Sequence, residues 1–325
     1  MDNITNAQSM QYYENNYNMV FGFIQRATKG GYEIADILNE TKKSKTYYVC
    51  DSCQKCRFCG KSAPEVSFKE KTHLFPESLG NKLFVSKNME CDSCNHIFSK
   101  YETDLNTFLY PFLMLNKICG KNGVKKYQSN DKSSRIEHAD NIIQITDTLG
   151  KTKIQEDEVK KEIRYEFDIN PYSLSNVYRI MLKMSLSMLN EGEFKKFSIV
   201  KDSLVNRKLL GCEVLFLDFF PGFNRFEFTV IGYMKKVDDP TVPTYQFAIM
   251  NGDFLLQIPI FSDYDIRNIG NKKIQINNLT IPTPFDKDAL LGEKQHYFFE
   301  IKDDIIKPHS NMTFTLKYES KTEVK

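Results

Sequence analysis

The hydrophobic positions along the chain recur at helical spacing before residue 211 and gather in short, dense segments after it. Apolar residues three and four positions apart fall on one face of a helix, so this spacing predicts where helices lie. Proline suits the first helical turn, because its missing N–H needs no partner there. The sequence predicts short helices at 19–24 and 32–38 on either side of Gly30-Gly31, a helix within 99–116 that ends near Pro111, and a helix from Pro171 towards Phe197.

The segments after residue 211 are rich in β-branched and aromatic residues and are separated by Gly, Pro, Asn and Asp. This composition favours strands joined by turns. We expect a mostly antiparallel sheet whose phenylalanines lie in the core. Its strands are predicted within 212–220, 225–234, 244–251, 254–261, 273–281, 295–301 and 312–319, and two earlier strands within 67–72 and 141–146.

These patterns place the chain in the α+β class and divide it into four regions. Its 325 residues suggest about two domains of roughly 150 residues each. We expect an N-terminal helical extension at 1–48, a cysteine-containing domain at 49–118, a linker at 119–160, and an accessory domain of one helix and the sheet at 161–325.

The composition is that of a soluble globular protein, with 41% hydrophobic and 26% charged residues. No apolar run approaches the ~20 residues that cross a bilayer, and the best candidate, 209–220, contains Glu213 and Asp218. The first residues lack the basic and apolar regions of a secretory signal. We therefore expect a cytoplasmic protein with reduced cysteines and no membrane partner.

Two Cys-x2-Cys pairs predict a zinc site. Cys56 and Cys59 are followed, after 31 residues, by Cys91 and Cys94. Each pair offers two thiolates in one tight turn, and four thiolates complete the tetrahedral shell of a structural zinc ion. The alternative, free thiols in an apolar core, does not favour this paired spacing.

Two further cysteines leave alternatives open. Six of the eight cysteines lie between positions 50 and 94, so Cys53 and Cys56 could also form a pair. Gly60 supplies the turn that favours Cys56 and Cys59 instead. Cys50 and Cys53 are then spare or bind a second ion.

A histidine and an asparagine lie beside the cysteine pairs. His73 precedes Pro76 and the Gly80-Asn81 turn, and Asn95 follows Cys94 at the start of the predicted helix. A zinc clip between turn and helix would bring His73 and Asn95 together. A neutral His can accept a proton from water, and a divalent ion can neutralise a phosphate, so this pair suits phosphodiester hydrolysis.

The segments CRFCG, THLFPESLGN and ECDSCNHIFSKYE, in this order, resemble the HNH endonuclease superfamily of ββα-metal nucleases. The resemblance covers about 54–110 and is closest to bacterial HNH proteins with a four-cysteine zinc site. It implies that 49–118 is an HNH nuclease domain. The segment 171–197 also resembles the region after the nuclease in a group of bacterial HNH proteins.

The resemblance implies roles for particular residues. His73 matches the general base, and Asn95 matches a ligand of the catalytic Mg²⁺ or Mn²⁺. Asn88 is the nearest match to the middle Asn that braces the histidine loop, and Asn81 competes with it. Many members carry an acidic residue where this chain has Thr72, so Glu77, with His96 and Glu102 as alternatives, is expected to hold the ion.

The formal charge of +2 hides an asymmetry that bears on the partner. Residues 42–126 contain 15 Lys and Arg and 8 Asp and Glu, an excess of seven positive charges, so the rest of the chain carries an excess of five negative charges. A basic nuclease region suits the phosphate backbone of DNA, although a solvated basic face is the alternative.

We therefore expect a zinc-stabilised endonuclease that cuts double-stranded DNA. The alternative is a catalytically weak or inactive zinc-finger module that binds nucleic acid. The resemblance also suggests a bacterial defence or mobile-element nuclease, regulated by a ligand or partner of the C-terminal domain. Homodimer formation stays open.

Overall fold

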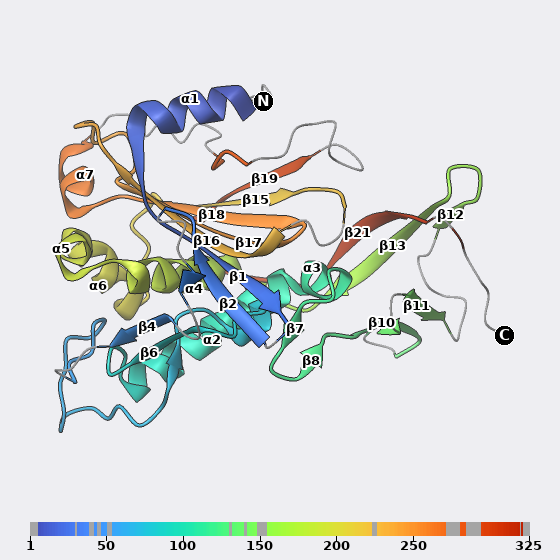
Figure 1. Cartoon of the computed structure of the whole chain (residues 1–325), viewed down its shortest axis with the longest axis horizontal. Helices are drawn as coiled ribbons and strands as arrows, with labels where there is room; N and C mark the ends of the chain where they lie inside the picture. Colours follow the sequence, from blue (N-terminus) through green and yellow to red (C-terminus); the bar gives the residue numbers. More distant parts are fainter. Residues whose placement is uncertain are drawn as a thin grey trace.

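The computed structural model describes residues 6–29, 31–38, 42–43, 47–50, 54–129, 132–139, 142–147, 155–222, 226–270, 280–283, 294–318 and 320. One sheet of eight antiparallel strands forms the centre of the described fold (Figure 1). Its order is β19 (Gln295–Glu300), β15 (Val214–Phe219), β18 (Phe254–Ile260), β17 (Tyr245–Gly252), β16 (Phe226–Lys235), β1 (Tyr17–Thr28), β2 (Gly31–Asp36) and β3 (Lys42–Lys43).

The structure confirms the α+β class and most of the late strands. Strands β15 to β19 lie within or one residue beyond five of the segments predicted to be strands. The sixth, β21 (Ser310–Lys317), pairs with β13 (Glu162–Ile169) in a separate sheet that also contains β12 (Gln155–Asp157). The strand expected at 273–281 falls mostly outside the described residues.

The two helices predicted near the N-terminus are wrong. The segments 19–24 and 32–38 lie largely in β1 and β2, and the only helix described before them is α1 (Asn6–Asn16). Short apolar runs do not distinguish the two periods, and β1 pairs with β16, about 210 positions away, which no local pattern reveals. The expected helical extension therefore contributes strands to the central sheet.

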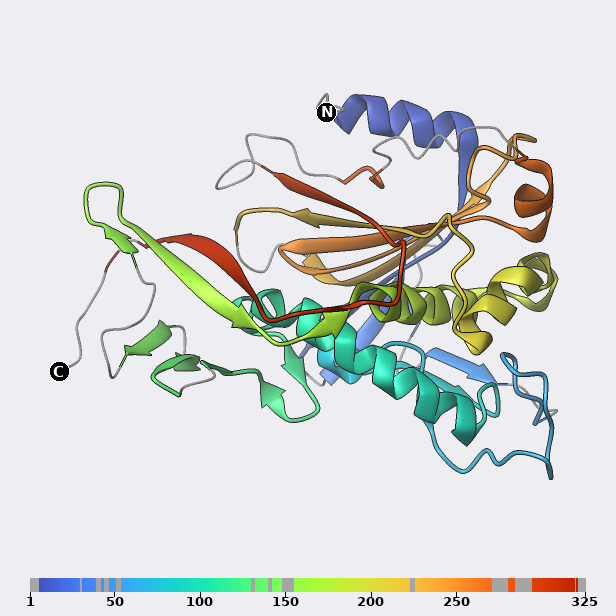
Figure 2. The same cartoon turned by 180° about the vertical axis from the view of Figure 1, so that it is seen from behind.

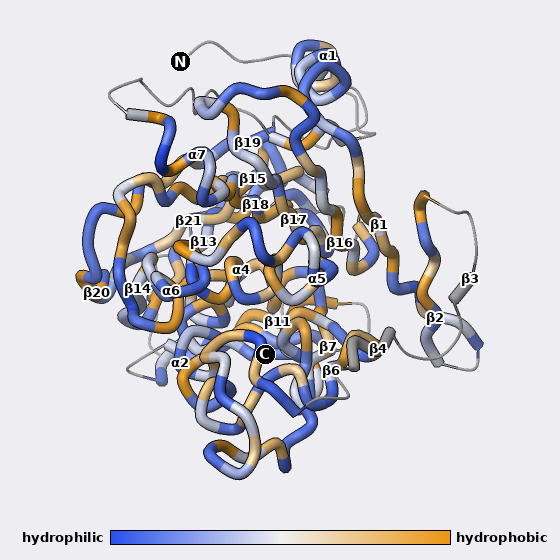
Figure 3. The backbone as a smooth tube through the Cα atoms, turned by 90° about the vertical axis from the view of Figure 1, so that its left-hand side faces the viewer, coloured by the Kyte–Doolittle hydropathy of each residue, from blue (hydrophilic) through white to orange (hydrophobic). Residues whose placement is uncertain are grey.

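Two helices lie beneath the sheet, one below the other. Helix α4 (Leu174–Met188) packs against β18 on one side and against α2 (Asp92–Phe108) on the other (Figure 2). Every residue of α4 except Asn176 is buried. Figure 3 shows the hydrophobic segments gathered around α4 and the neighbouring strands. One hydrophobic core therefore joins the predicted nuclease region to the sheet.

The limits of the long predicted helix are corrected by the structure. Pro171 precedes a short strand, β14 (Tyr172–Ser173), which pairs with β20 (Ile306–Lys307), so the helix begins three residues later than expected. It ends at Met188 because Leu189 is extended and the Asn190 side chain caps a new helix. The helices that follow are α5 (Glu191–Phe194), η2 (Lys195–Phe197) and α6 (Ser198–Asn206), with α7 (Asp263–Asn268) after β18.

A small ββα unit lies against the lower side of α4. Strands β5 (Thr72–His73) and β6 (Phe84–Lys87) form an antiparallel hairpin that leads into α2, and β4 (Tyr47–Cys50) pairs parallel to β6. A 3-10 turn, η1 (Glu77–Leu79), lies inside the hairpin, and α3 (Tyr110–Leu115) follows α2.

The strand expected at 67–72 is wrong except at its last residue. The Asp92 carboxylate accepts hydrogen bonds from the Ser67 hydroxyl and from the backbone N–H groups of Lys69 and Glu70. The segment therefore wraps around the first turn of α2 instead of pairing as a strand.

The region predicted to be a linker contains several short strands. The strand expected at 141–146 is confirmed as β11 (Ile142–Asp147), which pairs with β10 (Ser134–Ala139). The others are β7 (Cys119–Gly120), β8 (Gly123–Val124) and β9 (Tyr127–Gln128). Among the described residues, no helix has the length and apolarity that a membrane span requires.

Candidate functional site

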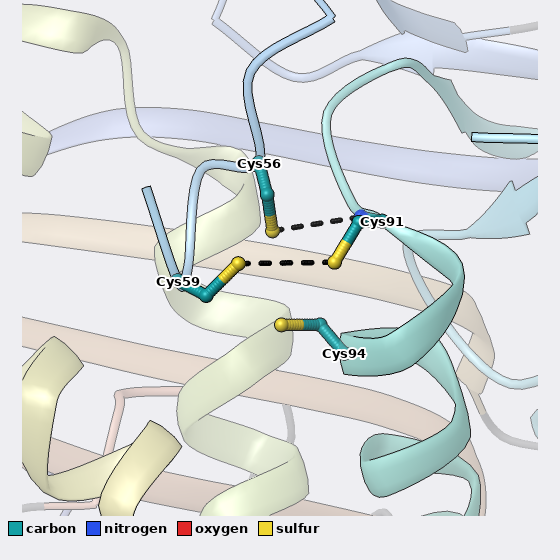
Figure 4. Close-up of side chains that lie close together, drawn as sticks. All are labelled: Cys56, Cys59, Cys91 and Cys94. Atoms are coloured by element: carbon teal, nitrogen blue, oxygen red, sulfur yellow. Dashed lines mark hydrogen bonds between the residues drawn. The ribbon is translucent and has the colours of Figure 1, made fainter. Parts of the chain in front are cut away.

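The four predicted cysteines meet at one point (Figure 4). The sulfur atoms of Cys56, Cys59, Cys91 and Cys94 all lie within 4.8 Å of one another, and those of Cys59 and Cys91 are 3.8 Å apart. A tetrahedral ion with Zn–S distances of ~2.3 Å requires sulfur atoms ~3.8 Å apart. The cluster therefore fits a four-thiolate zinc ion.

Backbone and side-chain contacts within the cluster act on its thiols in opposite directions. The Cys91 N–H donates to the Cys56 sulfur at 3.5 Å, and Cys91 is the N-cap residue of α2. The hydrogen bond from Cys94 lowers the pKa of the Cys56 thiol to about 5. The same contact, together with burial, raises the pKa of Cys94, and burial raises that of Cys91 to about 11. Gly60 adopts the left-handed region with φ of 75°, as expected for the turn after the first pair. The side chains of Cys50 and Cys53 lie outside the described residues.

A cavity of about 310 Å³ opens beside the cluster, between the β5–η1 segment and α2. His73 and Glu77 line it from the first segment. Asn95, Ser99, Glu102 and Asn106 line it from α2, where they follow one another at helical spacing. The structure thus brings together His73, Asn95 and both acidic residues considered as metal ligands.

His73 presents one ring nitrogen to the cavity. Its Nε2 lies 4.0 Å from a carboxylate oxygen of Glu77, whereas its Nδ1 is buried with no hydrogen-bond partner among the described residues. Burial lowers the pKa of His73, the charges of Lys71, Lys183 and Lys121 lower it further, and Glu77 opposes the shift. The imidazole is therefore neutral at pH 7.

Asn95 is oriented by a residue that the sequence did not single out. Its amide Nδ2 donates to the Glu70 carboxylate, which directs the Oδ1 oxygen away from Glu70. Glu70 comes before His73 on the loop that Asp92 holds. His96, the next residue on α2, is exposed and does not line the cavity.

A comparison with protein-family models matches the part of the chain that forms this site. Residues 56–106 match the model of a family described as HNH endonuclease. This segment is an HNH domain. The match begins at the first zinc-cluster cysteine and ends in α2, so it includes both cysteine pairs, His73 and the cavity face of α2. Comparison of the chain with curated proteins and with solved structures gave no match.

Asn81, the competing candidate to Asn88, makes hydrogen bonds on both sides of the loop after His73. The buried Asn81 amide donates to the carbonyl oxygens of Phe75 and Phe84 at 2.7 and 3.0 Å, and its Oδ1 accepts from the N–H groups of Leu83 and Phe84. Asn88 lies at a turn with φ of 61° and is not among the residues that line the cavity.

Thr72 does not take the place of the expected acidic ligand. Its side chain is buried, and its hydroxyl shares a hydrogen bond with that of Ser86 across the β5–β6 hairpin. Glu77 and Glu102 instead supply carboxylates to the cavity. The carboxylates that line this cavity thus come from the turn and the helix instead of the strand.

Three residues from outside the HNH domain hold its loop. Gln25 of β1 donates to the Gly80 carbonyl at 2.9 Å and accepts from the Lys82 N–H at 2.8 Å. Asn251 of β17 donates to the Leu79 carbonyl at 2.6 Å. Lys183 of α4 donates to the His73 carbonyl at 2.8 Å. Sequence reasoning missed all three, because each contact spans more than fifty positions.

Basic residues lie around the cavity of the HNH domain. Lys71 lines it, and Lys121, on the β7–β8 turn, is close enough to influence the pKa of His73. This hairpin approaches η1 closely: a Cβ atom at Gly120 would lie 3.2 Å from the Ser78 Cα. The site therefore combines a local positive rim with acidic groups inside.

Proposed function

We propose that this protein is a divalent-metal-dependent endonuclease that hydrolyses phosphodiester bonds in duplex DNA. One observation carries the proposal: His73, Glu77, Asn95 and Glu102 line a single cavity of an HNH domain, between the β5–η1 segment and α2. A general base and hard oxygen donors in one cavity suit hydrolysis of a phosphate ester.

His73 acts as the general base. Because its pKa is lowered, the ring is neutral at neutral pH, and in the tautomer that carries its proton on Nδ1 the Nε2 atom can accept a proton from the attacking water. Its position on β5, with register to Val85 of β6, fixes the backbone from which the ring projects. Asn81 and the three outside contacts hold the following loop in the same geometry.

The donor set fits a hard divalent cation. Glu77 and Glu102 offer carboxylate oxygens and Asn95 offers an amide oxygen, which are ligands that Mg²⁺ and Mn²⁺ prefer. Burial raises the pKa of Glu102, so a nearby cation would stabilise its ionised form. When bound, the ion neutralises the scissile phosphate and stabilises the leaving oxygen.

The four-cysteine cluster has a structural role in this proposal. Zinc bound by four thiolates has no open position for substrate, so it does not act on the phosphate itself. The four cysteines would hold such an ion between the turn at Cys56 and the N-terminus of α2, from which Asn95 projects. Four reduced thiols are also consistent with a cytoplasmic enzyme.

Electrostatics favour a nucleic-acid backbone as the substrate. Lys71 and Lys121 provide positive charge near His73, and lysines that contact phosphates supply most of the sequence-independent affinity for DNA. We therefore expect cleavage with little sequence preference.

The second candidate is a DNA-binding zinc module without nuclease activity. The burial of Thr72 where many HNH proteins carry an acidic ligand favours it. The two functions differ in one result. A binding module would shift DNA in a mobility-shift assay but would not cut it, whichever divalent ion is added.

A plasmid assay on the full-length, zinc-loaded protein tests the proposal. Supercoiled DNA and a structured RNA are each incubated with Mg²⁺, Mn²⁺ or EDTA, and the zinc content is measured afterwards. We expect nicked and linear DNA with either ion, none with EDTA, and recovery when Mg²⁺ is restored. DNA binding without cleavage under every condition would overturn the proposal, and preferred cleavage of RNA would overturn its substrate.

A further inference from the structure

One lysine of α4 lies almost wholly buried beneath the HNH domain. The Lys183 side chain is 2% exposed, and its Nζ donates to the His73 carbonyl oxygen at 2.8 Å. The same Nζ lies 3.2 Å from a carboxylate oxygen of Glu90, whose side chain is fully buried. One ammonium group thus contacts the backbone of the proposed base and the residue that precedes Cys91.

Burying the Lys183 ammonium group and the Glu90 carboxyl group costs free energy. Taking an ammonium and a carboxylate out of water carries a large desolvation penalty, and well-packed apolar residues of similar size often fill such positions equally well or better. The neighbours of Lys183 in α4, Leu182 and Met184, are apolar and buried. Packing alone therefore does not account for a lysine at this position.

The geometry points to a function in placing His73. We propose that Lys183 is a positioning residue, which fixes the backbone of His73 relative to the second cysteine pair through its contacts with the His73 carbonyl and Glu90. The inference rests on the proposed nuclease function and goes beyond it, because Lys183 lies outside the HNH domain and does not line the cavity.

The β5–β6 pairing leaves His73 in need of such a support. Strand β5 has only two residues, and β6 is its only described partner strand. Lys183 adds a contact from α4 at the His73 carbonyl. Glu90 is adjacent to Cys91, the N-cap residue of α2. The same ammonium therefore connects the backbone of His73 to the start of α2, from which Asn95 projects.

The test separates this role from a contribution to stability. Lys183→Met alone leaves the buried Glu90 carboxylate without its cation, so loss of folding would be ambiguous. The double variant Lys183→Met with Glu90→Gln removes both charges while leaving His73 without its donor. A merely structural pair would be replaced without loss of activity once the protein folds.

Cleavage kinetics on plasmid DNA are measured for the full-length protein with Mg²⁺. We expect the double variant to fold, to retain zinc, and to show a kcat at least about 10-fold lower at an unchanged KM, because misplacing a reacting group slows the chemical step. If this variant is insoluble, Lys183→Gln with Glu90→Gln serves, and the same loss is expected because the Gln side chain is shorter.

A matched control is available in the same fold. Lys235 and Asp265 form another buried ion pair, with Nζ and Oδ1 2.5 Å apart, remote from the cavity lining. We expect Lys235→Met with Asp265→Asn to leave the kcat of the folded protein unchanged. A wild-type kcat in the folded variant Lys183→Met with Glu90→Gln would overturn the positioning role and leave the proposed nuclease function standing. Absence of cleavage by the wild-type protein overturns the nuclease function and, with it, this inference.

Discussion

The ring of Phe75, two residues after His73, packs edge-on against the ring of Phe228 in the central sheet, with ring centroids 5.6 Å apart. Phe75 also stacks on Phe247 of the neighbouring strand and is fully buried. The loop that follows His73 therefore packs against a sheet formed by distant parts of the chain. This relationship bears on whether the domain can work alone.

We predict that a fragment of residues 49–118 does not fold stably, even with zinc. The fully buried side chains of Phe75, Leu79 and Phe84 would lose the sheet as a partner, and each exposed apolar side chain costs about 1.5–3 kcal/mol. Dispersion of the amide signals in an NMR spectrum of the zinc-loaded fragment checks this. A dispersed spectrum together with DNA cleavage would contradict the prediction.

Loss of one cluster cysteine is expected to remove the zinc and destabilise the protein. Cys94→Ser leaves three thiolates, and structural zinc sites contribute directly to folding free energy. We predict about one zinc per wild-type chain, far less in the variant, and a lower thermal midpoint, measured by metal analysis and calorimetry. Cys119→Ser, an exposed position outside the cluster, is the control. Equal zinc content in the two variants would exclude this cluster as the site.

The metal requirement of cleavage tests whether the acidic residues of the cavity bind the catalytic ion. We predict that Glu77→Gln and Glu102→Gln each raise the Mg²⁺ concentration for half-maximal cleavage about 10-fold or more, because a neutral amide replaces a charged oxygen donor. Glu65→Gln, exposed and paired with Lys61 at the surface, should leave it unchanged. A metal titration identical to that of the wild type in both cavity variants would show that neither carboxylate holds the ion.

Asp253 gives the fold a pH dependence. Its carboxyl accepts a hydrogen bond from Asn116 at 2.5 Å, and burial raises its pKa from 3.8 to about 7. The folded state therefore keeps a proton, between about pH 4 and pH 7, that the unfolded chain has released, so stability falls as the pH rises through this range.

We predict that Asp253→Asn weakens this dependence, because a neutral side chain carries no cost of ionisation. The free energy of unfolding should rise by up to about 4 kcal/mol at pH 8 and change little at pH 4, since one pKa unit corresponds to about 1.4 kcal/mol. Urea denaturation at the two pH values measures this. A variant less stable than the wild type at pH 8 would contradict the raised pKa of Asp253.

The parts of this account that the sequence could predict are those with a local signature. Spacing identified Cys56, Cys59, Cys91 and Cys94, which the structure gathers in one cluster. Residue composition identified the segments that form β15 to β19. His73 and Asn95 were found by motif and lie in one cavity. Each of these features is written within a short stretch of chain.

The parts that could not be predicted depend on contacts between distant residues. A period of two or 3.6 cannot be read from the six residues 19–24, and only the pairing with β16 decides that they form a strand. Gln25, Asn251 and Lys183 carry no motif, and their role appears only where they meet the loop. Asn81 and Asn88 differ in hydrogen bonding, which spacing does not encode.

The cleavage rate of His73→Ala tests the central claim most directly. The measurement is single-turnover nicking of supercoiled plasmid by full-length protein with Mg²⁺, with zinc content and thermal midpoint recorded for each variant and His96→Ala as the matched control on the exposed side of α2. We predict a rate at least about 100-fold lower for His73→Ala, because general bases contribute 10² to 10⁴, with zinc retained and His96→Ala near the wild type. Wild-type nicking by a folded His73→Ala protein would contradict the account.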